Sequence, residues 1–153
     1  MLIVFKLIAV FLMSFSVGIL YRIPRSLLCY VGVVGVAAWG VMHTAGAFGA
    51  NMILANFLGS IVIGGGAEML ARLLKKPATI FIIPGFFPLV PGGEAYTTML
   101  YMVKGQYVAG ISMGMRTLLT GGAIAFGIFS SSMAYRLITN YKIGSSMKHD
   151  QKG

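Results

Sequence analysis

Four long, uninterrupted apolar runs limit what this chain can fold into. They cover residues 2–20, 27–42, 51–70 and 108–132, and each approaches or exceeds the roughly 20 residues with which a helix spans hydrocarbon. The run 27–42 is short, and a thin bilayer accommodates such a mismatch. Because lipid cannot pair exposed backbone groups, helices are the expected spanning form. With 58% hydrophobic and 10% charged residues, the sequence predicts an all-α integral membrane protein.

A fifth apolar segment, residues 78–103, is broken by three prolines and three glycines within Ile83–Tyr96. Pro84, Pro88 and Pro91 each lack an amide hydrogen, and each ring clashes with the preceding helical turn. We therefore predict two half-helices, one over about 78–84 and one that begins near Gly92. Unwound backbone at membrane depth must be buried or line a cavity, which makes this segment the expected substrate site. The alternative is a proline kink that only shapes packing.

The second half-helix is expected to present its amino terminus to the substrate. The unpaired amides of Gly93 to Tyr96 and the positive end of the helix dipole favour a carboxylate at this position. Discontinuous helices bind substrates in this way in several transporter folds.

Two ionisable residues within apolar segments are candidate functional groups, because charge in hydrocarbon is expensive. Arg116 shares a helical face with Ser112 and Thr120, at four-residue spacing. Counted from the ends of their spans, Arg116 and Glu94 both lie roughly 24 Å from the same membrane face, so we predict that they can meet. Two alternatives remain open: Arg116 snorkels to the outer interface, and Glu94 only complements the helix dipole.

Other polar and small residues favour structural roles. Glu68 precedes Arg72 by four residues, the favourable order for a helical ion pair. The run Gly64–Gly66 lacks the Lys-Ser or Lys-Thr of a phosphate loop and fits close helix approach. The GxxxG of Gly110 and Gly114 likewise indicates contact with another helix. The sequence contains no evident metal cluster, cofactor motif or nucleophile–base set, so we expect no enzyme.

Basic residues predict the topology. Nine of the twelve Lys and Arg side chains fall after the first, third and fifth spans, which places the amino terminus outside and the carboxyl terminus in the cytoplasm. In a four-span alternative, residues 78–103 dip into the membrane and return. The net charge of +9 lies in short loops and in the polar tail, residues 140–153, which we expect to fray; a nucleic-acid partner is therefore not expected.

The proline–glycine segment also carries a family resemblance. Pro84 and Gly85, followed by Pro88, Pro91, Gly92 and Tyr96, resemble the second module of the threonine/serine exporter (ThrE-like) family, in its short YjjB-type form. The resemblance implies an exporter in the bacterial inner membrane, with threonine and serine as substrates of the fused form and succinate as that of the two-component form. It also implies a second membrane subunit that carries the other ThrE-type module.

Two functions follow from these observations. The first is an exporter subunit for small carboxylates, driven by a proton or ion gradient, which works with the second module or as a homo-oligomer in the lipid bilayer. Its predicted substrate-binding residues are Pro84, Gly85, Pro88, Pro91, Gly92, Gly93, Glu94, Tyr96, Ser112 and Arg116. The second is a scaffold or assembly subunit whose partner holds the transport path.

Overall fold

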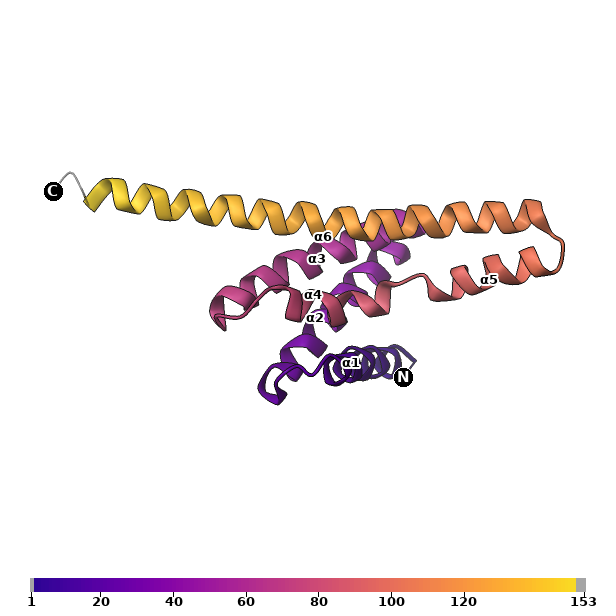
Figure 1. The fold of residues 1–153 in the computed structure, drawn as a ribbon, viewed down its shortest axis with the longest axis horizontal. Coiled ribbons are helices and arrows are strands. Elements are labelled where there is room, and N and C mark those ends of the chain that lie inside the picture. The colour runs from indigo at the N-terminus through magenta and orange to yellow at the C-terminus, as the bar shows by residue number, and fades with distance from the viewer. Residues whose placement is uncertain (1, 151–153) are drawn as a thin grey trace.

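The computed structural model describes the backbone of residues 2–150 and the side chains of residues 2–139. Every regular element in this part is helical: α1 (Leu2–Leu20), α2 (Arg25–Ala47), α3 (Met52–Leu73), α4 (Thr79–Phe86), the 3-10 helix η1 (Phe87–Leu89), α5 (Gly92–Val103) and α6 (Tyr107–Asp150) (Figure 1). The prediction of an all-α protein is confirmed.

Four helices are long and apolar enough to cross a membrane: α1, α2, α3 and residues 107–139 of α6. The run 27–42 gave a short second span, but α2 has 23 residues, because Arg25 and Ser26 extend its start and residues 43–47 extend its end. The second span therefore needs no thin bilayer.

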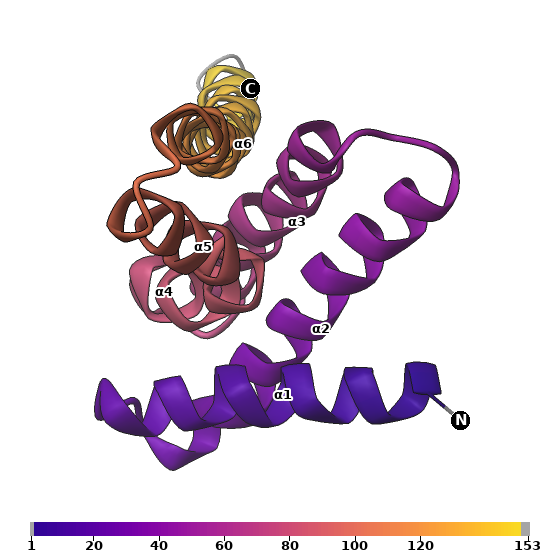
Figure 2. The ribbon, with the colours of Figure 1, turned by 90° about the vertical axis from the view of Figure 1, so that its right-hand side faces the viewer.

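The fifth segment is the broken one, and it runs in one direction. Figure 1 shows α4, η1 and α5 following one another alongside α6, and Figure 2, viewed along the same line, shows α5 in front of α4. A segment that dips and returns would place its two halves side by side instead. The arrangement favours the five-span prediction over the four-span alternative.

Helix α2 lies at the centre of the packing between α1, α3 and α4. Val31 of α2 packs with Ala67 of α3 and Phe81 of α4 in one buried cluster. A second cluster joins Val34 and Ile63 to Leu89 of η1. The residues just before the break are therefore anchored in the core, which fixes where α5 begins.

The crossing of α3 and α6 depends on glycine in both helices. A Cβ added at Gly64 would lie 2.6 Å from the Ile128 carbonyl oxygen, and one at Gly127 would lie 2.8 Å from the Phe57 carbonyl oxygen. Real Cβ atoms do not approach backbone so closely, so larger residues would push the helices apart. The predicted close approach is confirmed at Gly64, whereas Gly65 and Gly66 face open space.

The distribution of polarity is that of a protein in lipid. Many large apolar side chains of α1 and α6 are exposed, whereas Ser14, Asn56, Ser60, Glu68 and Thr120 are buried. Water would favour the opposite arrangement. Together with four apolar helices of spanning length, this distribution describes a multi-pass membrane protein.

The last helix is longer than expected. We predicted that residues 140–153 fray, but α6 continues to Asp150. The chain contains no proline after Pro91, so no proline forces α6 to end where the apolar run ends. The side chains from residue 140 onward and the whole of residues 151–153 lie outside the described part.

Candidate functional site

The break between α4 and α5 is shorter and later than predicted. The first half-helix was expected to end near Pro84, but α4 includes Pro84, and η1 continues the turn to Leu89. Pro84 lies inside α4, as the sixth of its eight residues, and its side chain is fully buried in the core. The chain becomes extended at Val90 (φ −59°, ψ 127°), because a residue before proline avoids the helical region.

The start of α5 at Gly92 matches the prediction, and it offers two unpaired amides. The Gly92 amide donates to the Val90 carbonyl at 2.8 Å, and the Ala95 amide donates to the Pro91 carbonyl at 3.0 Å. Among the described residues, none accepts from the amides of Gly93 and Glu94. Of the amides predicted to bind an anion, those of Gly93 and Glu94 are unpaired, and anion binding there stays a prediction.

An ion pair lies beside this helix start. Arg116 Nε is 3.6 Å from Glu94 Oε1, as the depth comparison predicted. Arg116 Nη2 also lies 3.7 Å from Met52 Sδ at the start of α3. The distance between Arg116 and Glu94 exceeds the 2.7–2.9 Å typical of charge-assisted hydrogen bonds, and the Arg116 side chain is 54% exposed. The guanidinium is thus loosely held and keeps donors for another anion.

Glu94 is the more enclosed member of the pair. Its side chain is 17% exposed, and its Oε2 atom is buried with no hydrogen-bond partner among the described residues. A buried carboxylate oxygen without a donor is unfavourable. The pair is therefore an incompletely satisfied arrangement, in which either member gains from an additional partner.

Small residues and threonines set the register that brings the two charges together. A Cβ added at Gly110 would lie 3.0 Å from Met102 Sδ, and one at Gly114 would lie 3.1 Å from Thr98 Cγ2. The GxxxG of α6 thus packs against α5 of the same chain. The Thr120 hydroxyl, fully buried, donates to the Arg116 carbonyl at 2.9 Å. Thr120 is therefore buried against protein, whereas Ser112 and Arg116 on the same helical face are exposed.

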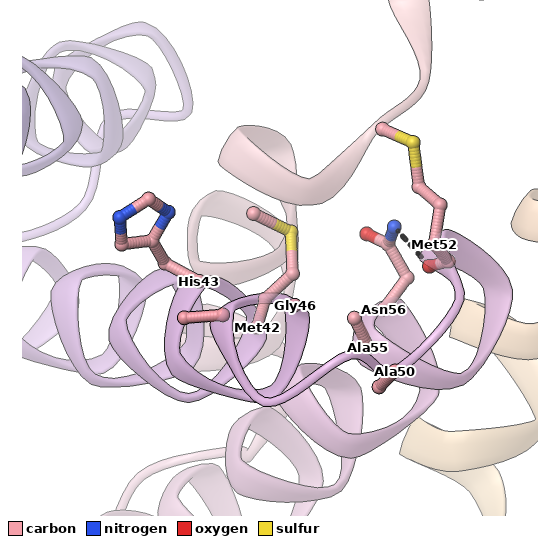
Figure 3. A pocket seen from close by; sticks show the side chains of 8 residues that line it. Met42, His43, Gly46, Ala50, Met52, Ala55 and Asn56 are labelled. Atoms are coloured by element: carbon pink, nitrogen blue, oxygen red, sulfur yellow. Dashed lines mark hydrogen bonds between the residues drawn. The ribbon is translucent and has the colours of Figure 1, made fainter.

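A pocket that sequence reasoning missed lies close to this pair, between the end of α2 and the start of α3 (Figure 3). It has a volume of about 330 Å³ and is lined by Met42, His43, Gly46, Met52, Asn56 and three alanines. Met52 belongs both to this wall and to the surroundings of Arg116. The asparagine within an apolar run was the available sequence signal, but the cavity depends on how the loop between α2 and α3 closes.

A comparison with protein families decides the identity at this point. A sequence model of the family described as "Threonine/Serine exporter, ThrE" matches residues 6–134. The chain belongs to the threonine/serine exporter family. The matched region contains α1 to α5, the break, and the part of α6 that carries Arg116. No solved structure matches the chain.

Membership makes the chain a membrane transporter domain, since the threonine/serine exporter family is a family of transporters rather than of enzymes. The break and the ion pair therefore belong to a transport protein. The prediction of the family from the proline–glycine segment is confirmed, whereas the YjjB-type subgroup stays a prediction.

Several predicted site residues of this ThrE-family chain lie apart from the ion pair. Tyr96 is 70% exposed and Ser112 is exposed, so a ligand contact for either stays a prediction. Pro84 and Gly85 are buried, and a Cβ added at Gly85 would lie 3.0 Å from Val34 Cγ1. In the described conformation these two residues hold α4 against α2.

Four other predicted residues surround the break itself. Pro88 packs beside Gly35 of α2, and Pro91 is the residue before the first turn of α5. Gly92, like Gly93, has open space where a side chain would project. The two glycines leave room for a small ligand next to the unpaired amides, whose contact with substrate stays a prediction.

The expected ion pair of Glu68 with Arg72 is wrong. Glu68, 5% exposed, accepts from Arg136 Nε of α6 at 2.7 Å instead. The Arg72 guanidinium lies over the Tyr135 ring, 5.5 Å from its centroid. The close α3–α6 crossing brings both α6 residues within reach, which the helical spacing of α3 could not reveal.

Proposed function

We propose that this chain is a subunit of an exporter of small carboxylates and that Arg116 binds the substrate carboxylate. The loose contact between Arg116 and Glu94 is the observation that carries this proposal. A guanidinium binds a carboxylate best through two parallel hydrogen bonds, and the distance to Glu94 leaves that arrangement unmade. The unpaired amides of Gly93 and Glu94 lie on the first turn of α5, which also carries the Glu94 side chain, and they add donors for the anion.

In this proposal the substrate carboxylate replaces Glu94 as the partner of Arg116. Binding then separates α5 from α6 locally, and release of the substrate restores the pair. Two alternative partners for one guanidinium give the two states that alternating access requires. The substrates that fit are a succinate-like dicarboxylate or the zwitterions threonine and serine, since each carries a carboxylate. A proton or ion gradient supplies the driving force.

A second membrane subunit completes the site. Helix α5 lies closest to α6, and none of its residues is buried among the described residues. Met99 and Val103 of α5 are 66% and 81% exposed. This uncovered helix supports a partner that carries the other ThrE-type module, or a second copy of the chain. The basic residues support a bacterial inner-membrane location with the amino terminus outside.

Efflux from proteoliposomes tests this function. Liposomes loaded with labelled succinate or threonine are compared with the chain alone, the second module alone, and both together. We expect efflux with both and its loss with Arg116→Gln, while Lys104→Gln, which removes a charge from the nearby α5–α6 loop, retains efflux. If the second module alone exports at the full rate, the chain is a scaffold and the proposal is wrong.

A further inference from the structure

The pocket between α2 and α3 contains one buried polar atom that the protein leaves unpaired. Asn56 is 1% exposed. Its Nδ2 donates to the Met52 carbonyl at 2.8 Å, which fixes the orientation of the amide, because only the nitrogen can donate. Its Oδ1 then faces the other way and has no hydrogen-bond partner among the described residues. Figure 3 shows this oxygen turned away from Met52, on the side of Met42.

Stability alone does not account for this oxygen. An acceptor that is buried without a donor is unfavourable, and leucine at the same position would avoid it. The rest of the pocket wall is mostly apolar, with Met42 and alanines around the amide. An apolar pocket with one well-placed polar group is the usual form of a small-molecule site. The group that this site lacks is a hydrogen-bond donor.

Met52 connects this pocket to the ion pair. Its backbone carbonyl holds the Asn56 amide, its side chain lines the pocket, and its sulfur lies 3.7 Å from Arg116 Nη2. Methionine side chains are unbranched and change rotamer easily. Met52 therefore contacts both the Arg116 guanidinium and the residue that carries the unpaired acceptor.

We propose that this pocket is the second half of the substrate site and that Asn56 Oδ1 selects substrates that carry an O–H or N–H donor. The inference rests on the proposed function, because it takes Arg116 as the anchor of the carboxylate. Met52, which contacts both Arg116 and Asn56, places the proposed carboxylate anchor and the unpaired acceptor on neighbouring parts of one site. A plain dicarboxylate lacks the donor and leaves the buried acceptor unsatisfied, so the pocket disfavours it.

The tryptophan of the chain reports on this pocket directly. The sequence contains one tryptophan, and the Trp39 ring stacks on His43 with 4.8 Å between ring centroids, while His43 lines the pocket. Trp39 fluorescence of the full chain in lipid nanodiscs therefore measures binding. The two probes are malate and succinate, which differ by one hydroxyl. We expect wild type to bind malate about five- to tenfold more tightly, the range of one hydrogen bond.

Three variants test the assignment. Asn56→Leu should remove the preference for malate, so that malate and succinate bind with equal affinity. Gly46→Leu fills the pocket from α2, where a side chain meets no atom within 4 Å, and should weaken malate binding about five- to tenfold. Gly40→Leu is the matched control on the same helix, also without a contact within 4 Å and outside the pocket, and should retain the preference.

The outcomes distinguish failure of the proposed selective pocket from failure of the proposed carboxylate site at Arg116. If Arg116→Gln weakens both probes but the malate preference survives in Asn56→Leu and in Gly46→Leu, the pocket does not select the substrate and the inference is overturned. If Arg116→Gln leaves both affinities unchanged, the proposed carboxylate site itself is wrong. Gly46→Leu retains Asn56, so it decides the question even if Asn56→Leu fails to fold.

Discussion

At the scale of single residues, Arg116 carries most of the proposed chemistry. Arg116→Lys keeps the positive charge but loses the planar fork that binds both carboxylate oxygens. We expect the apparent affinity for an exported carboxylate to fall about tenfold in Arg116→Lys and about a hundredfold in Arg116→Gln, the range for hydrogen bonds to charged groups. Efflux from proteoliposomes at several internal concentrations gives these values. Equal affinities in Arg116→Lys and wild type would refute a bidentate contact.

Glu94 has the opposite predicted effect, because it competes with the substrate for Arg116. In Glu94→Gln the guanidinium has no intramolecular anion beside it, so we expect carboxylate binding to tighten about three- to fivefold, the range of a partly exposed ion pair. Release should slow, and the maximal export rate should fall. Equilibrium binding and efflux, measured on the same preparation, separate the two effects. Weaker binding in Glu94→Gln would mean that Glu94 helps to hold the substrate.

Sequence alone predicted some of these residue contacts and missed others. Arg116 and Glu94 were expected to meet because membrane depth can be counted along a helix. The pairing of Glu68 with Arg136 was missed, since it depends on the α3–α6 crossing rather than on spacing within one helix. The unpaired oxygen of Asn56 was also missed, because an orphaned acceptor is defined by every neighbour around it.

At the scale of helices, the α3–α6 crossing gives a stability prediction. Gly64→Ala places a Cβ 2.6 Å from the Ile128 carbonyl oxygen, and backbone must shift to make room. We expect a loss of about 1–3 kcal/mol in the free energy of unfolding. Gly65→Ala is the control, since nothing lies within 4 Å of its Cβ, and alanine in a helix should be neutral or stabilising by up to about 1 kcal/mol. Chemical unfolding in detergent measures both, and equal effects would contradict the close crossing.

The break between η1 and α5 gives a second prediction at this scale. Pro91 holds Val90 in the extended region, so Pro91→Ala allows the helix to continue through residues 90–93. We expect the amides of Gly93 and Glu94 to exchange with deuterium at least tenfold more slowly, as amides in a helix do, and export to fall. Pro77→Ala, in the loop before α4, is the control and should change neither. Unchanged exchange in Pro91→Ala would show that proline does not maintain the break.

The limits of the helices were predictable where a sequence signal ends them. α1 begins and ends with its apolar run, and α5 begins at the glycine pair, as expected. α2 and α6 extend beyond their apolar runs because polar residues continue a helix when no proline stops it. The break occurs later than predicted, because core packing of Pro84 and Leu89 keeps the first half ordered.

At the scale of the whole molecule, the hairpin of α5 and the start of α6 extends away from the bundle of α1, α2 and α3 (Figure 1). Hydropathy could not predict this arrangement, because the hydropathy of an apolar helix is the same whether the helix packs against lipid, a partner or its own chain. The loose ion pair and the pocket lie at the start of α3, where Met52 contacts Arg116 and lines the pocket. In the proposed transporter, a second module covers the hairpin and closes the substrate path.

The contact between the substrate carboxylate and Arg116 can be measured directly. The full chain, assembled with the second module in lipid and labelled with ¹⁵N in the arginine guanidinium groups, is saturated with succinate or threonine labelled with ¹³C in the carboxylate. Solid-state NMR then reports dipolar coupling between the two labels. If Arg116 binds the substrate carboxylate, wild type shows this coupling and Arg116→Gln loses it. A coupling that persists in Arg116→Gln, or no coupling in a wild-type complex that exports the substrate, would contradict this contact.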